Sequence, residues 1–255
     1  MLATTACTST TNLSEATATE KGAHHNTKGG FINTSATFND DTAILPLLKR
    51  YITETRVDAT PSTDIPVIAV TAEQLKQIPP HQDSVIRLGH SSIYLQINGQ
   101  RWLIDPVFSE RASPFSFAGP KRFHQPPIAL TDLPDIDGVL ISHDHYDHLD
   151  KTSIKQLANS VSHFVVPLGV DKHLKDWGVS QAHIHPLDWW QAFKLDDVTI
   201  TATPTQHFSG RSLFDKNETL WASYVIKSTN SSLYFSGDSG YFDGFKQIGE
   251  RFGPF

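Results

Sequence analysis

The sequence predicts an α/β fold built from stacked layers of strands and helices. Two observations predict it. From residue 137 onward, short runs of β-branched and aromatic residues alternate with helix-like segments, and this alternation is typical of α/β layers. The chain has 255 residues, of which 38% are hydrophobic and 19% charged. This composition fits one globular domain with an appendage, and it excludes a fibre, a collagen and a wholly disordered chain.

The appendage comes first along the chain. Residues 1–30 contain eight Thr, five Ala and two Ser, with almost no large apolar side chain after Leu13. Such a stretch cannot bury enough apolar surface to offset its ordering entropy, so we expect a flexible tail. Residues 31–83 mix polar segments with short apolar ones, and we expect an N-terminal extension with one helix over 43–52. The domain then spans residues 84–255.

Each element of the domain has its own signal. Apolar runs between Val85 and Ile104, interrupted by an Asn98-Gly99 turn, predict a β-hairpin or meander. The helices that follow are expected over 151–160, 170–177 and 242–252. Strands are expected over 138–142, 164–166 and 182–185, where they alternate with these helices. Further strands are expected over 198–203, 221–227 and 232–236, because these runs are rich in β-branched and aromatic residues.

The charge and the rare residue types narrow the function. The net charge is −6, which provides no field to hold a polyanion, so nucleic acid is not expected as a partner. A single cysteine, Cys7, excludes an intrachain disulfide and a cysteine-based zinc site. Thirteen histidines stand against it, eight of them between His143 and His207. This surplus predicts a metal site made of imidazoles and carboxylates.

The central motif is the segment Ser142-His143-Asp144-His145-Tyr146-Asp147-His148, directly after an apolar strand. Its H-x-H-x-D-H spacing places two imidazoles on one side of a tight loop and an Asp/His pair on the other. That is enough to begin two adjacent metal sites. The alternative, a hydrated polar loop, would leave three imidazoles and a carboxylate packed together without a function.

Further ligands are expected at the ends of later strands. His207 follows the strand 198–203, and Asp238 follows the strand 232–236. Loops at strand ends are where a rigid scaffold presents functional side chains. Taken alone, His207 would be an ordinary surface histidine; together with the motif it is a candidate ligand.

At this point the sequence resembles a known family. The order of H-x-H-x-D-H, a later His and a strand ending in Gly-Asp resembles the metallo-β-lactamase superfamily. More specifically, several short segments resemble the phospholipases D that hydrolyse N-acyl phosphatidylethanolamine, and their bacterial relatives. These segments are Asp105-Pro-Val-Phe-Ser, Gly119-Pro-Lys-Arg-Phe123, Asp188-Trp-Trp190, Pro204-Thr-Gln-His207, Leu220-Trp221 and Gly249-Glu-Arg-Phe-Gly-Pro-Phe255.

The resemblance implies an αββα sandwich with two zinc ions at one edge. It implies that the first metal is held by His143, His145 and His207. It assigns Asp147 and His148 to the second metal and makes Asp238 the bridging ligand. Asp105 resembles a family residue that supports the metal loop from behind, although a turn-forming Asp-Pro is an equal alternative. His90, after Gly89, corresponds to a position lining the active-site edge.

The chemistry that the resemblance implies is hydrolysis by a hydroxide that bridges two metal ions. Asp147 is the candidate to orient the nucleophile and pass a proton to the leaving group. Three cations, Lys121, Arg122 and Arg211, are candidates to meet a phosphate or an anionic lipid surface. For each of them, an ordinary solvated position is the alternative.

The expected function is therefore that of a zinc-dependent phosphodiesterase of the phospholipase D type, acting on N-acyl phosphatidylethanolamine-like lipids at a membrane surface. A hydrolase of lactones or other small cyclic esters is the first alternative, because the same hydroxide attacks carbonyl carbon. The family carries a further His near its C-terminus, and this chain stops at Phe255. We therefore expect a truncated domain, and an inactive metal-binding fragment is the second alternative.

The compartment follows from the N-terminus. No charged and apolar leader precedes Cys7, so the default expectation is a cytoplasmic protein. The Ser/Thr-rich run after this cysteine resembles the start of a mature lipoprotein, and a membrane anchor through Cys7 is the alternative if an upstream leader exists. The sequence leaves the oligomeric state open.

Overall fold

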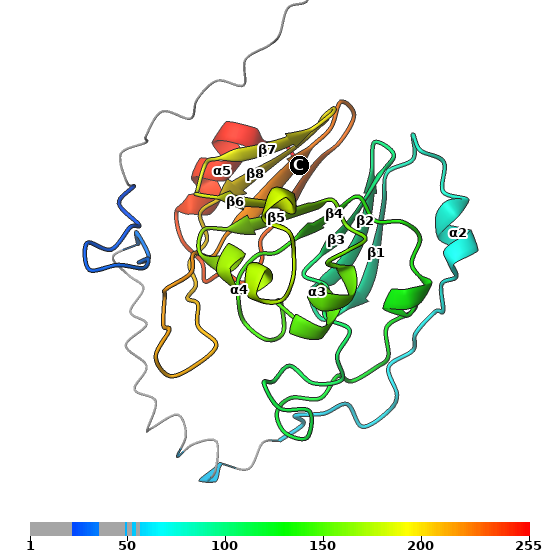
Figure 1. The fold of residues 1–255 in the computed structure, drawn as a ribbon, viewed down its shortest axis with the longest axis horizontal. Helices are drawn as coiled ribbons and strands as arrows, with labels where there is room; N and C mark the ends of the chain where they lie inside the picture. The colour runs from blue at the N-terminus through cyan, green and yellow to red at the C-terminus, as the bar shows by residue number, and fades with distance from the viewer. Residues whose placement is uncertain (1–21, 36–48, 50–52, 55–56) are drawn as a thin grey trace, which may run out of the picture.

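Two β-sheets packed face to face form the centre of the molecule (Figure 1). The computed structural model describes residues 22–35, 49, 53, 54 and 57–255. In the first sheet the order β1-β2-β3-β4-β5-β6 follows the chain; β1 to β3 pair antiparallel, and β3 to β6 pair parallel. Its strands are β1 (Ser84–Gly89), β2 (Ser92–Ile97), β3 (Gln100–Ile104), β4 (Gly138–Leu140), β5 (His163–Pro167) and β6 (Ile184–Leu187).

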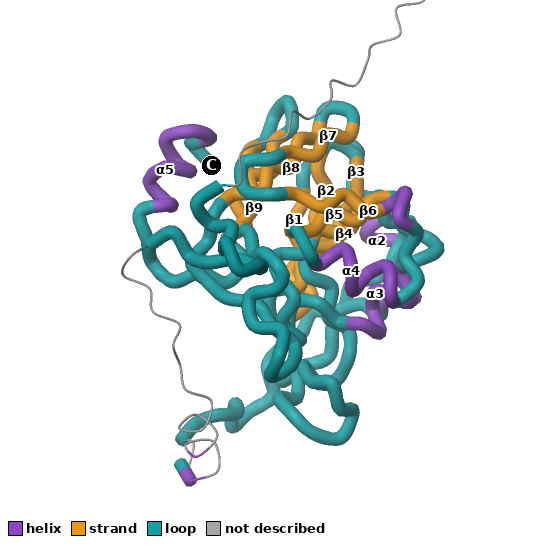
Figure 2. Tube along the Cα trace, turned by 60° about the vertical axis from the view of Figure 1, so that its left-hand side comes forward, coloured by secondary structure: helices purple, strands orange, loops and turns teal. Residues whose placement is uncertain are grey.

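The second sheet is antiparallel throughout and has the order β10-β9-β8-β7. Its strands are β7 (Ala192–Leu195), β8 (Val198–Thr203), β9 (Ser223–Lys227) and β10 (Ser232–Phe235). Two helices, α3 (Lys151–Leu157) and α4 (Val170–Asp176), cover the outer face of the first sheet (Figure 2). Helix α5 (Gly244–Phe252) lies outside the second sheet, with the ring of Phe245 at 6.3 Å from that of Tyr234 in β10. The αββα sandwich expected from the sequence is therefore confirmed.

The pleat of the first sheet divides its side chains between two cores. Leu103, Val139 and Phe164 point toward helices α3 and α4 and join the first hydrophobic cluster. Their neighbours in sequence, including Trp102 and Leu140, point the other way and pack against the second sheet. Successive strand residues face opposite sides, so one buried strand supplies both cores. This explains why these strands read as continuous apolar runs.

Most of the predicted elements are present, with short corrections. The strand predicted over 182–185 is wrong at its start, because Gln181–His183 form a 3-10 helix before β6. The strand predicted from residue 221 begins only at Ser223, because the N–H of Ala222 donates to Ser142 O, across the sandwich, at 2.9 Å. The sequence missed β7 and the short helix α2 (Ala72–Lys76), which Thr71 caps. The helix predicted over 43–52 lies outside the described residues, apart from Lys49.

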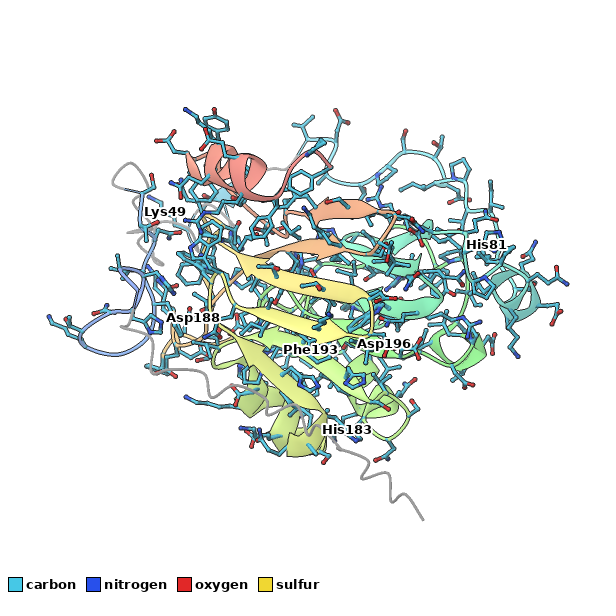
Figure 3. The ribbon with its side chains drawn as sticks, turned by 90° about the horizontal axis from the view of Figure 1, so that it is seen from above. Lys49, His81, His183, Asp188, Phe193 and Asp196 are labelled. Atoms are coloured by element: carbon cyan, nitrogen blue, oxygen red, sulfur yellow. The ribbon has the colours of Figure 1, made fainter. Side chains whose placement is uncertain are left out.

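Part of the expected tail is packed on the domain. Residues 22–30 belong to the predicted flexible segment 1–30, but His24 is buried and both His24 and His25 contact Asp188. Figure 3 shows Asp188 beside this N-terminal segment, which is drawn in blue. The sequence did not predict this, because composition does not reveal a polar contact between residues so far apart in the chain. No described helix is long and apolar enough to cross a membrane.

Candidate metal centre

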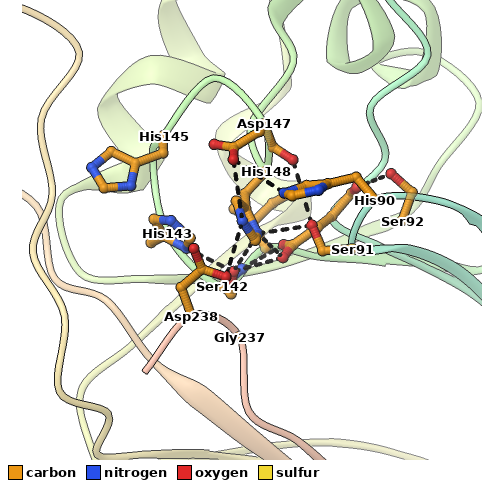
Figure 4. Close-up of polar contacts among 12 residues, drawn as sticks. His90, Ser91, Ser92, Ser142, His143, His145, Asp147, His148, Gly237 and Asp238 are labelled. Carbon is orange, nitrogen blue, oxygen red and sulfur yellow. Dashed lines mark hydrogen bonds and ion pairs between the residues drawn. The ribbon is translucent and has the colours of Figure 1, made fainter. Parts of the chain in front are cut away.

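Strands from both sheets deliver their following residues to one place (Figure 4). The motif loop begins just after β4, His207 follows β8, and Asp238 follows β10. At Gly237 the chain has a φ of 55°, and a Cβ there would come within 3.0 Å of the side chain of Ser142. Only glycine combines this backbone conformation with so close an approach, so Gly237 brings Asp238 up to the motif loop.

The predicted ligands gather into overlapping groups. In each group the candidate ligand atoms lie within 4.8 Å of one another. Atoms Nδ1 of His145 and Nε2 of His207 are 3.2 Å apart, and Nε2 of His148 is 3.3 Å from Oδ1 of Asp238. The groups are His143, His145 and His207; His143, His148 and Asp238; and His90, Asp147 and His148.

One ring nitrogen in this cluster is left without a hydrogen-bond partner. Nε2 of His143 is buried and makes no hydrogen bond, whereas the buried Nε2 of His148 pairs with Oδ1 of Asp238 at 3.3 Å. The opposite nitrogen of each ring is held: Nδ1 of His143 is 2.9 Å from Ser142 Oγ, and Nδ1 of His148 is 2.7 Å from Asp105 Oδ2. A buried polar atom without a partner is costly, so it points to a missing group. Imidazole nitrogens and carboxylate oxygens with open positions between them fit divalent metal ions such as zinc.

Asp105 lies directly behind this cluster. It follows β3, has a φ of 43° and is wholly buried. Its Oδ1 accepts a hydrogen bond from the N–H of Ser142 at 2.7 Å, and its Oδ2 accepts one from the Ser142 hydroxyl at 2.6 Å. With the contact to His148, one carboxylate therefore fixes both ends of the motif loop. This is the supporting position that the resemblance implies for Asp105, and a carboxylate behind a ligand histidine is a recurrent feature of metal sites.

Burial and neighbouring charges set the protonation of the candidate ligands. Burial lowers the pKa of His143 well below its usual value, and burial lowers that of His207 to about 4. Both imidazoles are thus neutral at neutral pH, which is the state that binds metal. Burial also acts to lower the pKa of His148, but the hydrogen bond and charge of Asp105 outweigh it and raise the value to about 10. A metal ion at Nε2 of His148 would therefore displace a proton.

The motif loop is also held from its outer side. Asp144, inside the motif, accepts hydrogen bonds from the N–H of Gly210 at 2.8 Å and from the hydroxyl of Thr219 at 2.9 Å. The guanidinium of Arg211 donates to the carbonyl oxygens of Asp144 and Leu149 and lies 3.9 Å from the centre of the Tyr146 ring. The structure thus gives Arg211 a supporting place within the loop; a phosphate contact for it stays a prediction.

The other predicted site residues surround a groove beside the cluster. Nε2 of His90 lies 3.1 Å from Oδ2 of Asp147. His90 therefore contacts a candidate ligand directly and does not merely line the edge of the site. The ammonium of Lys121 pairs with the exposed carboxylate of Glu110 at 2.8 Å. Arg122 donates to carbonyl oxygens, including that of Val107 at 2.8 Å, and so braces its own loop. All three cationic candidates line hollows next to the cluster.

Sequence reasoning missed the residues that act through others. Ser142 and Asp144 lie in the motif without belonging to its metal pattern, and Asn33 contacts the main chain of His207 from 174 positions away. The residue types of the motif do not indicate that Ser142, Asp144 and Asn33 make these supporting contacts. Ser142 and Asp144 could have been suspected only because they lie beside candidate ligands in the sequence.

Comparison with known proteins agrees with this geometry. Residues 100–255 match the model of the β-lactamase superfamily domain. The chain belongs to the metallo-β-lactamase superfamily. This superfamily groups metal-dependent hydrolases, and the family match includes every predicted metal ligand.

The relatives that this chain matches in sequence align with it over about half of their own length. An uncharacterized protein of Mycobacterium tuberculosis is 49% identical over 168 residues, which cover 66% of this chain and 45% of that protein. An N-acyl-phosphatidylethanolamine-hydrolyzing phospholipase D of Caenorhabditis elegans is 38% identical over 205 residues, covering 75% of this chain and 56% of that one. The chain thus spans about half the length of the curated relatives it matches.

A solved structure supports the fold itself. A metallo hydrolase from the archaeon Ignicoccus hospitalis is similar with a TM-score of 0.51 and 22% identity, covering 67% of this chain and 66% of that one. At this identity the likeness concerns the fold alone. The superfamily assignment thus rests on the family match over residues 100–255.

Proposed function

We propose that this chain is a zinc-dependent phosphodiesterase of the phospholipase D type, acting on N-acyl phosphatidylethanolamine-like lipids. The observation that carries the proposal is that the candidate metal cluster opens onto an apolar groove. The 38% identity to the phospholipase D of Caenorhabditis elegans supports the same substrate class. A phosphodiester bound at the cluster would leave its acyl chains in the groove.

The groove has the size and lining expected for a lipid chain. Its volume is about 1000 Å³, and its lining includes His90, His145 and Asp147 from the cluster. Ligand sites are commonly clefts of this size with mostly apolar walls and a few polar groups. Burying a methylene group contributes about 0.8 kcal/mol, so an acyl chain would bind here chiefly through its length. The apolar walls are formed by Ile65, Val67, Ile68, Val70, Ile86 and Phe123.

The reaction needs a base close to phosphorus, and Asp147 suits that role. Burial acts to raise its pKa, but the hydrogen bond from His90 and the charge of His148 outweigh it and hold the pKa well below its usual value. Asp147 is therefore ionised at neutral pH; the lowered pKa makes it too weak a base for free water, but it can orient the attacking water and accept a proton from water that a bound cation has acidified. When bound, divalent cations would acidify that water and neutralise charge on the phosphoryl oxygens.

The expected bond changes follow from this arrangement. The water oxygen bonds to phosphorus, and the bond from phosphorus to the head-group oxygen breaks. Asp147 takes the proton from the water and passes it to the departing alkoxide. Lys121 lines the groove, and its ammonium pairs with the exposed carboxylate of Glu110. The guanidinium of Arg122 instead donates hydrogen bonds to carbonyl oxygens of its own loop. Lys121 is therefore the better placed cation for a lipid phosphate.

Exposed aromatic side chains favour a lipid surface as the place of work. Phe117 is 80% exposed in the segment between β3 and β4, and Phe214 is 90% exposed in the segment between β8 and β9. In Figure 1 these segments, one green and one orange, extend from the lower part of the molecule. Exposed apolar side chains of this size are typical of contact with a membrane or a protein. Phe115 and Leu213 in the same segments are also exposed.

The test compares substrates on one zinc-loaded protein. The chain is assayed with N-acyl phosphatidylethanolamine and with a long-chain lactone, and the kcat/KM ratio identifies the preferred class. We expect phosphatidate from the phospholipid and a loss of at least about 100-fold in Asp147→Asn. Preference for the lactone would replace this proposal with the cyclic-ester alternative. Tight binding of zinc without turnover of either substrate would show a metal-binding fragment.

A matched pair of variants tests the groove. Ile68→Asp places a charge in the groove wall, and Val57→Asp places one at a similarly exposed site outside it. We expect KM for the long-chain lipid to rise in Ile68→Asp alone, with activity on a short-chain phosphodiester unchanged. Equal effects in the two variants would contradict acyl binding in the groove.

A further inference from the structure

Residues 22–35, named here the N-terminal strap, lie outside the part of the chain that matches the family model, residues 100–255. The strap is nonetheless tied to the domain. Phe31 is buried in the core between the two sheets, and its N–H donates to the carbonyl of Asn217 at 2.8 Å. The strap is therefore packed on the domain, although it lies outside the segment that matches the family model.

One of these contacts reaches a candidate metal ligand. Nδ2 of Asn33 donates to the carbonyl oxygen of His207 at 2.7 Å, and Oδ1 of Asn33 accepts from the N–H of His207 at 3.1 Å. A single carboxamide thus satisfies both main-chain groups of that residue. His207 follows β8 in a loop; the neighbouring Gln206 is held by an isolated bridge to Gly240, but the main-chain N–H and C=O of His207 itself are bonded by Asn33. The contact fixes the position from which the imidazole of His207 extends.

The backbone of the strap sets the reach of Asn33. Gly30 has a φ of 75°, and a Cβ there would lie 2.4 Å from the carbonyl oxygen of Asn217. The chain can take this turn only with glycine. On the other side, the N–H of Asn217 donates to Ser209 O at 3.0 Å, two residues beyond His207. The turn therefore ties the strap to the segment that carries the ligand.

The other end of the strap is clasped to the domain by two histidines. Nε2 of His24 lies 2.6 Å from Oδ1 of Asp188, and Nε2 of His25 lies 2.7 Å from Oδ2 of the same carboxylate. The ring of His24 also stacks on that of Trp189, with centroids 4.2 Å apart. The clasp therefore fixes the first residues of the strap on the loop after β6.

The clasp is hydrogen-bonded, although two imidazoles and a carboxylate are also a possible metal set. Its atoms are 2.6 and 2.7 Å apart, the distance of charge-assisted hydrogen bonds. In the main cluster Nδ1 of His145 and Nε2 of His207 stay 3.2 Å apart, and the buried Nε2 of His143 has no hydrogen-bond partner. The clasp contains neither feature, which favours a mechanical role.

From these contacts we propose that the N-terminal strap is a working part of the metal centre. Asn33 is a positioning residue that holds His207 in place as a ligand, and the clasp of His24 and His25 on Asp188 holds the strap. This proposal rests on the metal centre alone and not on the identity of the substrate. A failure of the phospholipase proposal would leave it intact.

The test measures metal binding without any substrate. Zinc affinity is obtained by competition with a chelator, and the geometry of the site is followed by the visible absorption spectrum of the cobalt-substituted protein. In Asn33→Ala we expect one of the bound ions to be held 10- to 100-fold more weakly, the range typical for loss of a group that orients a ligand. The cobalt spectrum should change as well. The matched control is Asn26→Ala, whose side chain accepts a hydrogen bond from Lys28 N within the strap.

Two further variants test whether the hydrogen bonds of Asn33 and the clasp cause the change in zinc affinity. Asn33→Asp retains the acceptor for the N–H of His207 and should recover part of the affinity, provided that circular dichroism shows a native fold. The double variant His24→Ala/His25→Ala should weaken the same ion as Asn33→Ala does. Unchanged zinc affinity and cobalt spectrum in folded Asn33→Ala would overturn the proposal. A third cobalt ion that disappears in the double variant would overturn the mechanical role of the clasp.

Discussion

The Nδ1 atom of His148 lies 2.7 Å from Oδ2 of Asp105, and both side chains are wholly buried. This contact turns Nε2 of His148 toward the cluster, where it lies 3.3 Å from Oδ1 of Asp238. The same carboxylate accepts hydrogen bonds from the main chain and hydroxyl of Ser142, next to the first ligand. Asp105 therefore sets the orientation of a candidate ligand while lying behind it.

The first prediction concerns the loss of this carboxylate charge. We expect Asp105→Asn to weaken zinc binding 10- to 100-fold at the site that includes His148, because the imidazole loses its orienting acceptor and its basicity falls. Chelator competition measures the effect. The matched control is Asp135→Asn, an exposed position on the loop before β4. Equal zinc affinity in Asp105→Asn and wild type would contradict this role.

The second prediction concerns removal of the metal. The cluster places imidazoles and carboxylates so close together that an ion binding only the folded state should stabilise it. At a free concentration 100 times Kd, the gain is about 2.7 kcal/mol. We expect Tm to fall when a chelator is added and to recover with excess zinc. In His143→Ala the shift should be much smaller, and a chelator that leaves the wild-type Tm unchanged would argue against a metal centre.

Much of this candidate centre was predictable because most of its candidate ligands are close in sequence. His143, His145, Asp147 and His148 share one loop, so their spacing alone indicates a common site. His207 and Asp238 needed one more step, namely that the ends of buried strands meet at one edge of the sandwich. The apolar runs predicted the strands because burial on both faces leaves little room for polar residues.

The contacts that hold the centre were not predictable in this way. Asn33 reaches His207 across 174 positions, and His24 reaches Asp188 across 164. Such pairs form only where two folded surfaces meet, and the amino-acid composition does not indicate which surfaces meet. The same limit explains why the hydrogen bonds from the guanidinium of Arg211 to the carbonyls of the motif loop were not predicted; its contact with a phosphate stays a prediction.

The third prediction concerns the packing between the sheets. Gly138 in β4 lies under the indole of Trp102, and a Cβ there would meet its ring carbons at 2.2 to 2.6 Å. We expect Gly138→Ala to lower the free energy of unfolding by about 1–3 kcal/mol, because the ring is buried and cannot move away. Urea denaturation of the metal-free protein measures this.

The control for that substitution is another glycine. Gly249 lies in helix α5, where a Cβ would have no neighbouring atom within 4 Å and the φ is not unusual. Gly249→Ala should therefore raise stability by about 0.5–1 kcal/mol through helix propensity. Opposite signs for the two glycines are the expected result. A stability loss of similar size in both would mean that close contact with Trp102 is not the cause.

The last prediction concerns acid. Burial acts to raise the pKa of Asp188, but the hydrogen bonds from His24 and His25 outweigh it and hold the pKa below its usual value. The unfolded chain has a pKa near 3.9 at this position, so the folded state binds the proton less readily. The contribution of Asp188 to stability is then complete above about pH 4, and it is lost as the pH falls through the lowered value. Asp188→Asn should lower Tm at pH 7 and at pH 5, and its difference from wild type should shrink below about pH 4. A difference that stays constant down to pH 3 in the metal-free protein would show that the carboxylate charge does not hold the strap.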